Sequence, residues 1–259
     1  ALGLWEHQIA DHRTGDYSRH AAIDRHDPGR GAPYPRHGGF YVLTWAKAYQ
    51  KTKDPVFLKA IDVVITGLDN DRRSGGMVVS RNRKSGKRTA YDLSVTISAW
   101  EAASLVPEDL AGKLRRFAAA NDDAYAKAAG SGSRGPKEHQ DENGGSQARP
   151  NLWSSGYGGA GGEIAGRANL CLMRYRQVKL APYRDTAIAT ARRYLDDEIN
   201  LSYPVYPGTV GKVVLLMLGV YELIGEARYL DRADALAGQA VKLFLGDGCP
   251  LPKATHVHD

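Results

Sequence analysis

The feature of this sequence that most constrains its fold is a helical hairpin that recurs along the chain. In its first copy, apolar residues between Phe40 and Tyr49 recur every three or four positions, which is the period of an amphipathic helix. A polar, lysine-rich stretch follows, after which Asp54 can cap a second helix and Pro55 fits its first turn. The second apolar pattern ends near Gly67. This stretch therefore predicts two antiparallel helices joined by a short turn.

A pair of aromatic residues marks the hairpin turn and recurs with it. The two aromatic residues lie eight positions apart, and the same spacing occurs three times. The pairs are Tyr49 and Phe57, Tyr175 and Tyr183, and Tyr221 and Tyr229. A looser hairpin is predicted between them, with one helix over 93–105 and a second from Pro107 to about Ala129. Self-similarity at roughly 50 residues predicts an array of helical pairs, and therefore an all-α fold.

The length and composition fit a globular chain. The 259 residues suit one large domain, and no polar linker divides them, so we expect a single domain over residues 1–259. We expect no signal peptide and no apolar segment of membrane length. The sequence starts without Met and stops in an extended polar segment, so we expect a piece of a longer chain. Residues 130–150 hold almost no apolar side chains and are predicted to be an exposed, flexible insertion.

The charge balance favours an anionic partner. The net charge is +6 and the isoelectric point is near 9.2. The basic residues are scattered and form no recognised nucleic-acid module, so nucleic acid is not the expected partner. The densest basic cluster, residues 81–88, is interpreted as the solvated turn of a small β-hairpin near 76–91, with a binding patch as the alternative.

The two cysteines carry little functional information. Cys171 lies in an apolar run and is predicted to be a buried, small hydrophobic residue. Together with Cys249 it makes no disulfide framework. The compartment therefore stays open, with a periplasmic or secreted location as the candidate.

Candidate functional residues gather in the four segments that precede the first helix of each hairpin. These segments combine aromatic side chains with Gly, Pro and polar groups, and they span residues 30–39, 89–92, 151–162 and 202–209. If the hairpins pack side by side, all four segments emerge at one end of the fold. The aromatic residues expected to stack on a ligand are Tyr34, Tyr91, Trp153, Tyr203 and Tyr206. The candidate catalytic residues are Arg36, His37, Asp92, Tyr157, Glu163 and Arg167.

The repeated hairpins carry a family resemblance. The turn AKAYQKTKDPVFLKA, from Ala46 to Ala60, resembles the hairpin turns of the α/α-toroid carbohydrate-active enzymes. This superfamily includes six-hairpin glycoside hydrolases and several polysaccharide lyase families. The resemblance spans about residues 38–246 and is architectural, without a catalytic motif. It implies a toroid, partial or complete, with a saccharide cleft at the end where the first helix of each hairpin begins. Four hairpins are predicted here rather than six, so the ring is partial or continues outside this sequence.

Elimination is the reaction that these residue types favour. An acidic polysaccharide is cleaved by elimination once its uronate carboxylate is neutralised, and the planar guanidinium of Arg36 or Arg167 can do this. His37 or Tyr157 would then remove the adjacent proton. The ordinary alternative for His37 is a residue near a helix start that bonds to the backbone. The basic net charge favours elimination.

Two other functions stay open. Hydrolysis would use Asp92 and Glu163 as a carboxylate pair, although acidic residues at helix starts are also ordinary caps. A non-catalytic helical-repeat scaffold would need no chemistry at all. The expected partner is an acidic polysaccharide or oligosaccharide, with no nucleic acid and no membrane, and the oligomeric state is open.

No cofactor and no metal site are expected. The N-terminal region is rich in His and Asp, and His7 and Asp11 are one helical turn apart. Their spacing matches no recognised metal site, and such clusters are common on solvated helices. His139, Asp141 and Glu142 are interpreted in the same way, as side chains of a solvated loop.

Overall fold

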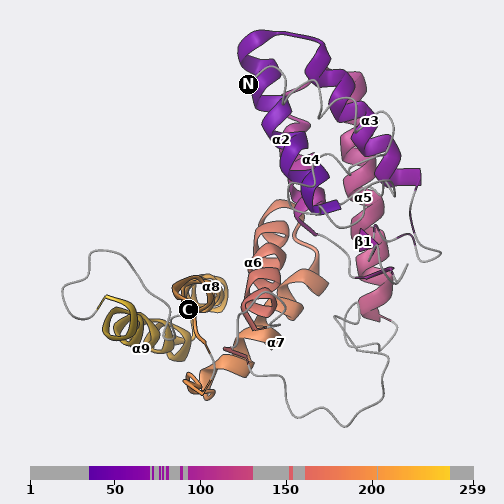
Figure 1. Cartoon of the computed structure of the whole chain (residues 1–259). Helices are drawn as coiled ribbons and strands as arrows, with labels where there is room; N and C mark the ends of the chain where they lie inside the picture. Colours follow the sequence, from indigo (N-terminus) through magenta and orange to yellow (C-terminus); the bar gives the residue numbers. More distant parts are fainter. Residues whose placement is uncertain are drawn as a thin grey trace. The chain divides into compact units, whose positions relative to one another are not determined.

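In the computed structural model, the chain divides into two compact units, residues 1–141 and 142–259 (Figure 1). The structure describes residues 35–70, 72, 76, 78, 80–81, 88–89, 93–130, 152–153, 161–202 and 204–245. Within these ranges, the side chains of 35–40, 80–81, 88–89 and 161–163 are not described. The expectation of one domain over 1–259 stays a prediction.

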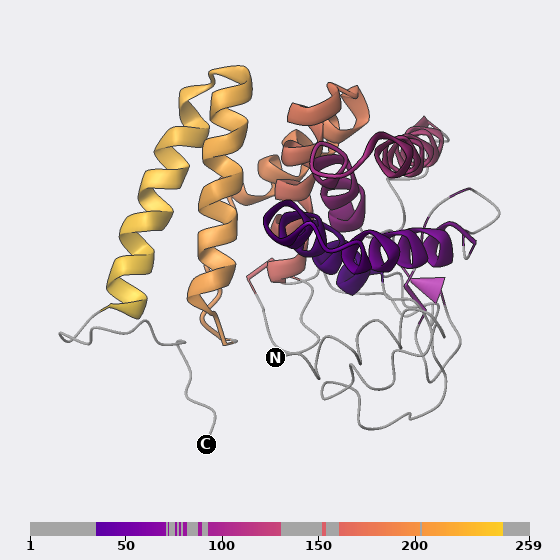
Figure 2. The same cartoon turned by 90° about the horizontal axis from the view of Figure 1, so that it is seen from above.

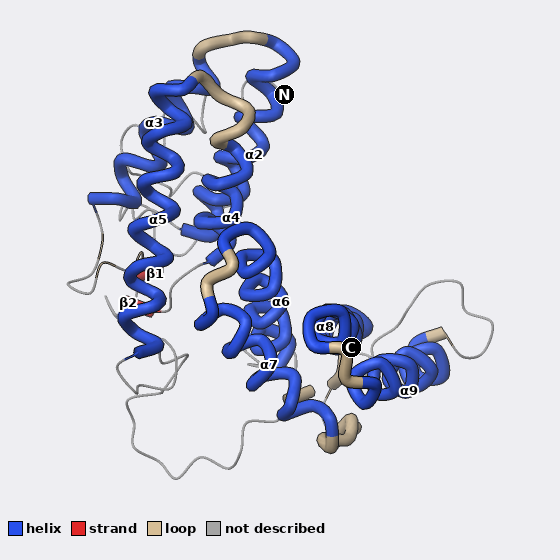
Figure 3. Tube along the Cα trace, turned by 180° about the vertical axis from the view of Figure 1, so that it is seen from behind, coloured by secondary structure: helices blue, strands red, loops and turns tan. Residues whose placement is uncertain are grey.

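The described residues are mostly helical, which confirms the predicted all-α class (Figure 3). Of the described helices, four lie in each unit, where the first pairs with the second and the third with the fourth as hairpins. Asp54 starts the second helix of the first hairpin as predicted, because its Oδ1 accepts the backbone N–H of Val56 at 2.9 Å. The predicted insertion at 130–150 lies outside the described residues, apart from Gly130, which ends a helix.

The first unit contains two hairpins that pack on each other. The first comprises α2 (Pro35–Thr52) and α3 (Val56–Asn70), and the second comprises α4 (Leu93–Ala102) and α5 (Glu108–Gly130). Helix α2 packs on α4, and α3 contacts α5. The buried core between them includes Trp45, Ile61, Val64, Ile65, Leu68, Val95, Ala99, Leu114 and Phe117. The predicted boundaries of both hairpins are therefore correct to within a few residues.

Arg72, which follows α3, contacts α5 and the backbone of Gly76. The Arg72 side chain hydrogen-bonds Asn121 Oδ1, donates to the carbonyl of Gly76 at 2.7 Å, and lies 4.9 Å from the ring centroid of Phe117. Asn121 is fully buried on α5, and its amide donates to Thr96 Oγ1 on α4 at 2.8 Å. These polar contacts connect α4, α5 and the residues after α3. Both the oxygen and the nitrogen of the buried Asn121 amide are therefore hydrogen-bonded.

A short antiparallel pair of strands lies where the β-hairpin was predicted. Strand β1 (Ser80–Arg81) pairs with β2 (Arg88–Thr89), with Ser80 opposite Thr89. Residues 82–87, which would form the turn, lie outside the described part of the chain. The hairpin as a whole stays a prediction.

The second unit repeats one hairpin with a fixed spacing. It contains α6 (Gly161–Val178), α7 (Ala181–Leu195), α8 (Pro207–Ile224) and α9 (Ala227–Phe244). The starts of α6 and α8 are 46 residues apart, and so are the starts of α7 and α9. Helices α8 and α9 lie side by side (Figure 2), and α6 packs on both α7 and α8. The repeat in this unit is therefore a structural unit as well as a sequence pattern.

The three aromatic pairs mark turns that share one backbone geometry. At each turn a residue with positive φ follows the first helix: Lys53 at 58°, Lys179 at 56° and Gly225 at 71°. The N–H of each donates to the carbonyl of the tyrosine four residues earlier, at 2.7–2.8 Å. This is the left-handed cap of a helix C-terminus. Eight residues is thus the distance from the last turn of one helix to the first turn of the next.

Helix α8 requires a correction to one expectation. Among the described helices it is long and apolar enough to cross a membrane, by length and composition alone. No apolar segment of membrane length was expected from the sequence. A core helix of a soluble protein passes the same test, and α8 buries Val213, Leu216, Met217 and Val220 inside the second unit. Packing within the unit accounts for part of its apolar character, because 33% of this apolar window is buried and Leu215 is exposed.

Candidate functional site

The contacts along the α6–α8 interface show that these two helices run in the same direction. Toward their beginnings, Asn169 Nδ2 donates to the backbone carbonyl of Lys212 at 2.8 Å. Toward their ends, Arg176 pairs with Glu222 at 2.5 Å. The beginnings of α6 and α8 therefore lie at one end of the second unit, and the two hairpin turns lie at the other.

Three of the predicted site residues reach this common end of the second unit. Glu163 is in the first turn of α6, and Arg167 follows one turn later with a half-buried side chain. Tyr206 is the residue before α8; its backbone is extended, and its carbonyl accepts the N–H of Thr209 at 2.9 Å. The first residues of α6 and α8 therefore share one end of the second unit, and the convergence of the segments that precede them stays a prediction.

Trp153 has a different place from the one expected for a stacking platform. Its side chain is fully buried, and its indole N–H donates to Asp197 Oδ2 at 2.7 Å. Its ring meets Tyr194 edge to face, with centroids 5.4 Å apart. A ring without an exposed face cannot stack on a ligand from solvent, so this geometry supports a role in the core of the unit.

The remaining predicted site residues cannot be placed with their side chains. Arg36 and His37 lie in the first turn of α2, and their side chains are not described. The others lie outside the described residues: Tyr34, Tyr91, Asp92, Tyr157 and Tyr203. Their convergence on one cleft, and the pairing of Asp92 with Glu163, stay predictions.

The described residues offer no ready metal site. Among them, no group of three or more His, Cys, Asp or Glu side chains could hold a metal ion. The N-terminal His7 and Asp11 lie outside the described part, as do His139, Asp141 and Glu142. Cys171 is buried on α6 and carries a free thiol, as its apolar surroundings in the sequence predicted.

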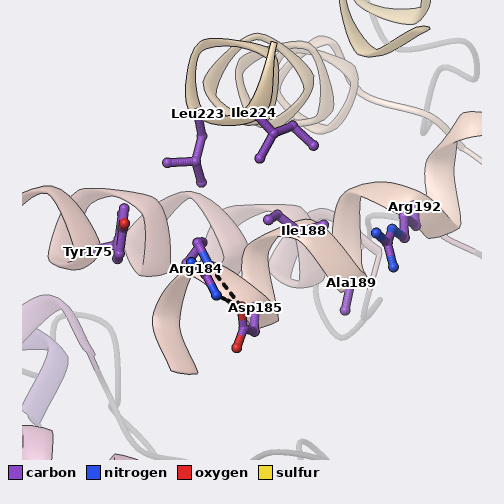
Figure 4. Close-up of a pocket in the computed structure, with 8 residues that line it drawn as sticks. All are labelled: Tyr175, Arg184, Asp185, Ile188, Ala189, Arg192, Leu223 and Ile224. Carbon is purple, nitrogen blue, oxygen red and sulfur yellow. Dashed lines mark hydrogen bonds and ion pairs between the residues drawn. The ribbon is translucent and has the colours of Figure 1, made fainter. Parts of the chain in front are cut away.

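The second unit has a hollow toward the ends of α6 and α8, which was not among the predicted sites. Its volume is about 430 Å³ (Figure 4). It is lined by Tyr175 on α6, Leu223 and Ile224 on α8, and five residues of α7: Arg184, Asp185, Ile188, Ala189 and Arg192. A signal was present in the sequence, because Arg184, Ile188 and Arg192 recur every four residues and so share one face of α7.

An ion pair shapes the electrostatics of one end of this hollow. Arg184 lies 2.9 Å from Asp185 Oδ1, and its hydrogen bond to Asp185 raises the pKa of the guanidinium above its ordinary value. The phenol of Tyr175 contributes in the same direction. Arg184 therefore remains charged, but Asp185 offsets much of its field.

No protein-family model matches this sequence, and no curated protein resembles it at a significant level.

Proposed function

We propose that this protein binds an acidic polysaccharide at the end where the first helices of its hairpins begin, and cleaves it by β-elimination. The observation that carries the proposal is the common direction of α6 and α8. It brings Glu163, Arg167 and Tyr206 to one end of a hairpin pair. The basic net charge of +6 suits a polyanionic substrate.

The proposed architecture is an α/α toroid, partial or complete, with a small β-hairpin. Support comes from the packing inside each unit, where the first helices of successive hairpins pack together and the second helices also contact each other. A layer of first helices next to a layer of second helices is the local arrangement from which such a ring is built. The strand pair at Ser80 and Thr89 supports the β-hairpin.

In the proposed reaction, an arginine neutralises the carboxylate of a uronate residue. Arg167 or Arg36 fills this role because a guanidinium forms two parallel hydrogen bonds with a carboxylate. His37 or Tyr157 takes the proton from the carbon next to the carboxylate. The bond to the leaving glycosidic oxygen then breaks, that oxygen gains a proton, and a carbon–carbon double bond forms in the sugar.

A second candidate function is a non-catalytic binding scaffold. The observation that favours it is the regular 46-residue offset between the two hairpins of the second unit. Helical scaffold repeats of the two- and three-helix kind have periods of about 40–47 residues. In this case the same end of the hairpins would bind saccharide or another partner without cleaving it.

One assay with two signals separates these functions. The chain is incubated with a panel of uronate-containing and neutral polysaccharides, and both ultraviolet absorbance and new reducing ends are measured. Elimination produces an unsaturated sugar and therefore both signals. New reducing ends without ultraviolet absorbance would indicate hydrolysis instead of elimination. Asp92 and Glu163 would then be the carboxylate pair to test. Saccharide binding without either signal would indicate a non-catalytic binding scaffold instead of an enzyme.

A further inference from the structure

The hollow toward the ends of α6 and α8 has a charge pattern that the proposed function does not use. Its Arg184 end lies beside the turn between α6 and α7, and its Arg192 end lies near the end of α7. Its two guanidinium groups, on Arg184 and Arg192, are eight residues apart on α7. Eight residues of α-helix span about 12 Å, so the two groups mark the two ends of the hollow.

The two arginines differ in their partners. Arg184 is held by Asp185 (Figure 4), so this end of the hollow is close to neutral. Arg192 is exposed and makes no hydrogen bond or ion pair with any part of the chain that the structure describes. The uncompensated positive charge in this hollow therefore lies at the Arg192 end.

The surface between the two ends is apolar. Ile188 and Ala189 lie between the arginines on α7, and Leu223 and Ile224 project from α8 toward them (Figure 4). Ile188, Leu223 and Ile224 are all half-buried, so they keep some surface that a ligand can cover. A volume of about 430 Å³ falls in the range of small-molecule sites rather than polymer clefts.

A hollow in the first unit has a different balance of charges. It lies between α3 and α5 and is lined by Leu58, Lys59, Asp62, Asp109, Leu110 and Lys113. There Lys113 bonds Asp62 Oδ1 at 2.5 Å and Thr66 Oγ1 at 2.6 Å. That hollow is lined by two lysines and two carboxylates, whereas the hollow of the second unit is lined by two arginines and one carboxylate.

We propose that the hollow of the second unit binds a small carboxylate with an apolar body, of the medium-chain acyl type. The carboxylate lies on the guanidinium of Arg192, and the chain covers Ile188, Leu223 and Ile224. A simple cation is disfavoured because the free charge is positive. A neutral hydrocarbon leaves Arg192 without a partner, and a short carboxylate leaves the apolar wall uncovered. Charge and apolar surface together select the amphipathic anion.

The test uses octanoate as the probe, titrated into the whole chain by isothermal calorimetry. We expect saturable binding with a Kd of about 1 mM or lower, and much weaker binding of octanol and of acetate. The variant Arg192→Gln is expected to weaken octanoate binding about tenfold or more, because charge-assisted hydrogen bonds are the strong ones. Circular dichroism checks that each variant keeps its helices.

Arg193→Gln is the matched control. Arg193 is the next residue of α7, is exposed, and does not line the hollow, yet its removal changes the net charge by the same amount. It should bind octanoate as the unmodified chain does. Equal weakening of octanoate binding in both variants would show that the net charge alone causes the effect, and it would overturn the proposal. Octanol binding as tightly as octanoate, or no saturable octanoate binding up to about 10 mM, would also overturn it.

Discussion

Leu172 of α6 packs directly onto the backbone of α8 at Gly219. A Cβ atom built on Gly219 would lie 2.6 Å from Leu172 Cδ1, closer than real Cβ contacts allow. The two helices of the second unit that begin at a common end therefore approach each other closely at a glycine. This contact lies in the interface between α6, which carries Glu163 and Arg167, and α8, which Tyr206 precedes.

Substituting Gly219 should loosen this contact. We expect Gly219→Ala to lower the free energy of unfolding by about 1–3 kcal/mol, because a methyl group is forced into a filled space. The control is Gly211→Ala on the same helix, where a new Cβ meets nothing within 4 Å. At Gly211 the substitution changes only the helix propensity, so the free energy of unfolding should rise by up to about 1 kcal/mol. Urea denaturation followed by circular dichroism measures both, and a rise for both variants would contradict the close contact.

Gly225 should resist substitution for a different reason. Its φ of 71° is in the left-handed region that glycine adopts without strain. We expect Gly225→Ala to lower the free energy of unfolding by about 1 kcal/mol, since a Cβ disfavours this conformation. Gly238→Ala, inside α9 and facing open space, should raise it instead. Thermal or urea unfolding of the two variants gives the comparison, and the same sign in both would refute the assigned turn geometry.

The buried hydroxyl of Tyr229 is predicted to lower the free energy of unfolding. Tyr229 is fully buried, and its hydroxyl has no hydrogen-bond partner in the described structure. Phe57 stands at the equivalent turn position in the first hairpin, so the position accepts a ring without a hydroxyl. We expect Tyr229→Phe to raise the free energy of unfolding by about 1 kcal/mol.

Tyr194→Phe is the control for that substitution. The hydroxyl of Tyr194 is also buried but donates to the carbonyl of Leu152 at 3.5 Å, a long and weak bond. Its removal should lower stability by about 0.5 kcal/mol. A loss of stability in Tyr229→Phe as large as in Tyr194→Phe would show that the Tyr229 hydroxyl has a partner.

Arg72 should be the most sensitive arginine tested in the first unit. Arg72→Ala leaves the buried Asn121 oxygen without its donor, and we expect a loss of about 3 kcal/mol in unfolding free energy. Arg72→Lys should recover only part of this, because an ammonium cannot reproduce the planar fork. Arg115→Ala breaks an exposed pair with Glu108 and should cost under about 1 kcal/mol. Equal effects at the two sites, measured by urea denaturation, would contradict this account.

Much of the helical fold could be predicted from local sequence. Apolar periodicity located the hairpins, and Asp54 followed by Pro55 marked the start of α3, where the predicted cap contact is present. The aromatic spacing of eight residues identified three turns because it reflects a local backbone geometry shared by Lys53, Lys179 and Gly225. Patterns of this kind depend on residues that are close in sequence, so they can be recognised without knowledge of the tertiary packing.

The candidate site was less accessible to sequence reasoning. Trp153 sits among Gly, Ser and Tyr residues that suggest an exposed loop, but its burial depends on Tyr194 and Asp197, more than 40 residues away. The hollow at Arg192 likewise requires Leu223 and Ile224 of another helix. Contacts between distant segments decide both, and a single sequence holds no direct record of them.

The central claim, elimination at the end where α6 and α8 begin, is tested most directly by the initial rate of unsaturated product from a uronate polysaccharide in matched variants. Arg167→Gln should slow it about a hundredfold or more if that arginine neutralises the carboxylate, and His37→Ala or Tyr157→Phe should do so if either is the base. Arg176→Gln, on the same helix but paired with Glu222 toward its other end, should keep the rate of the unmodified chain. Absence of unsaturated product from every uronate substrate, or full activity in the Arg167, His37 and Tyr157 variants alike, would contradict the account.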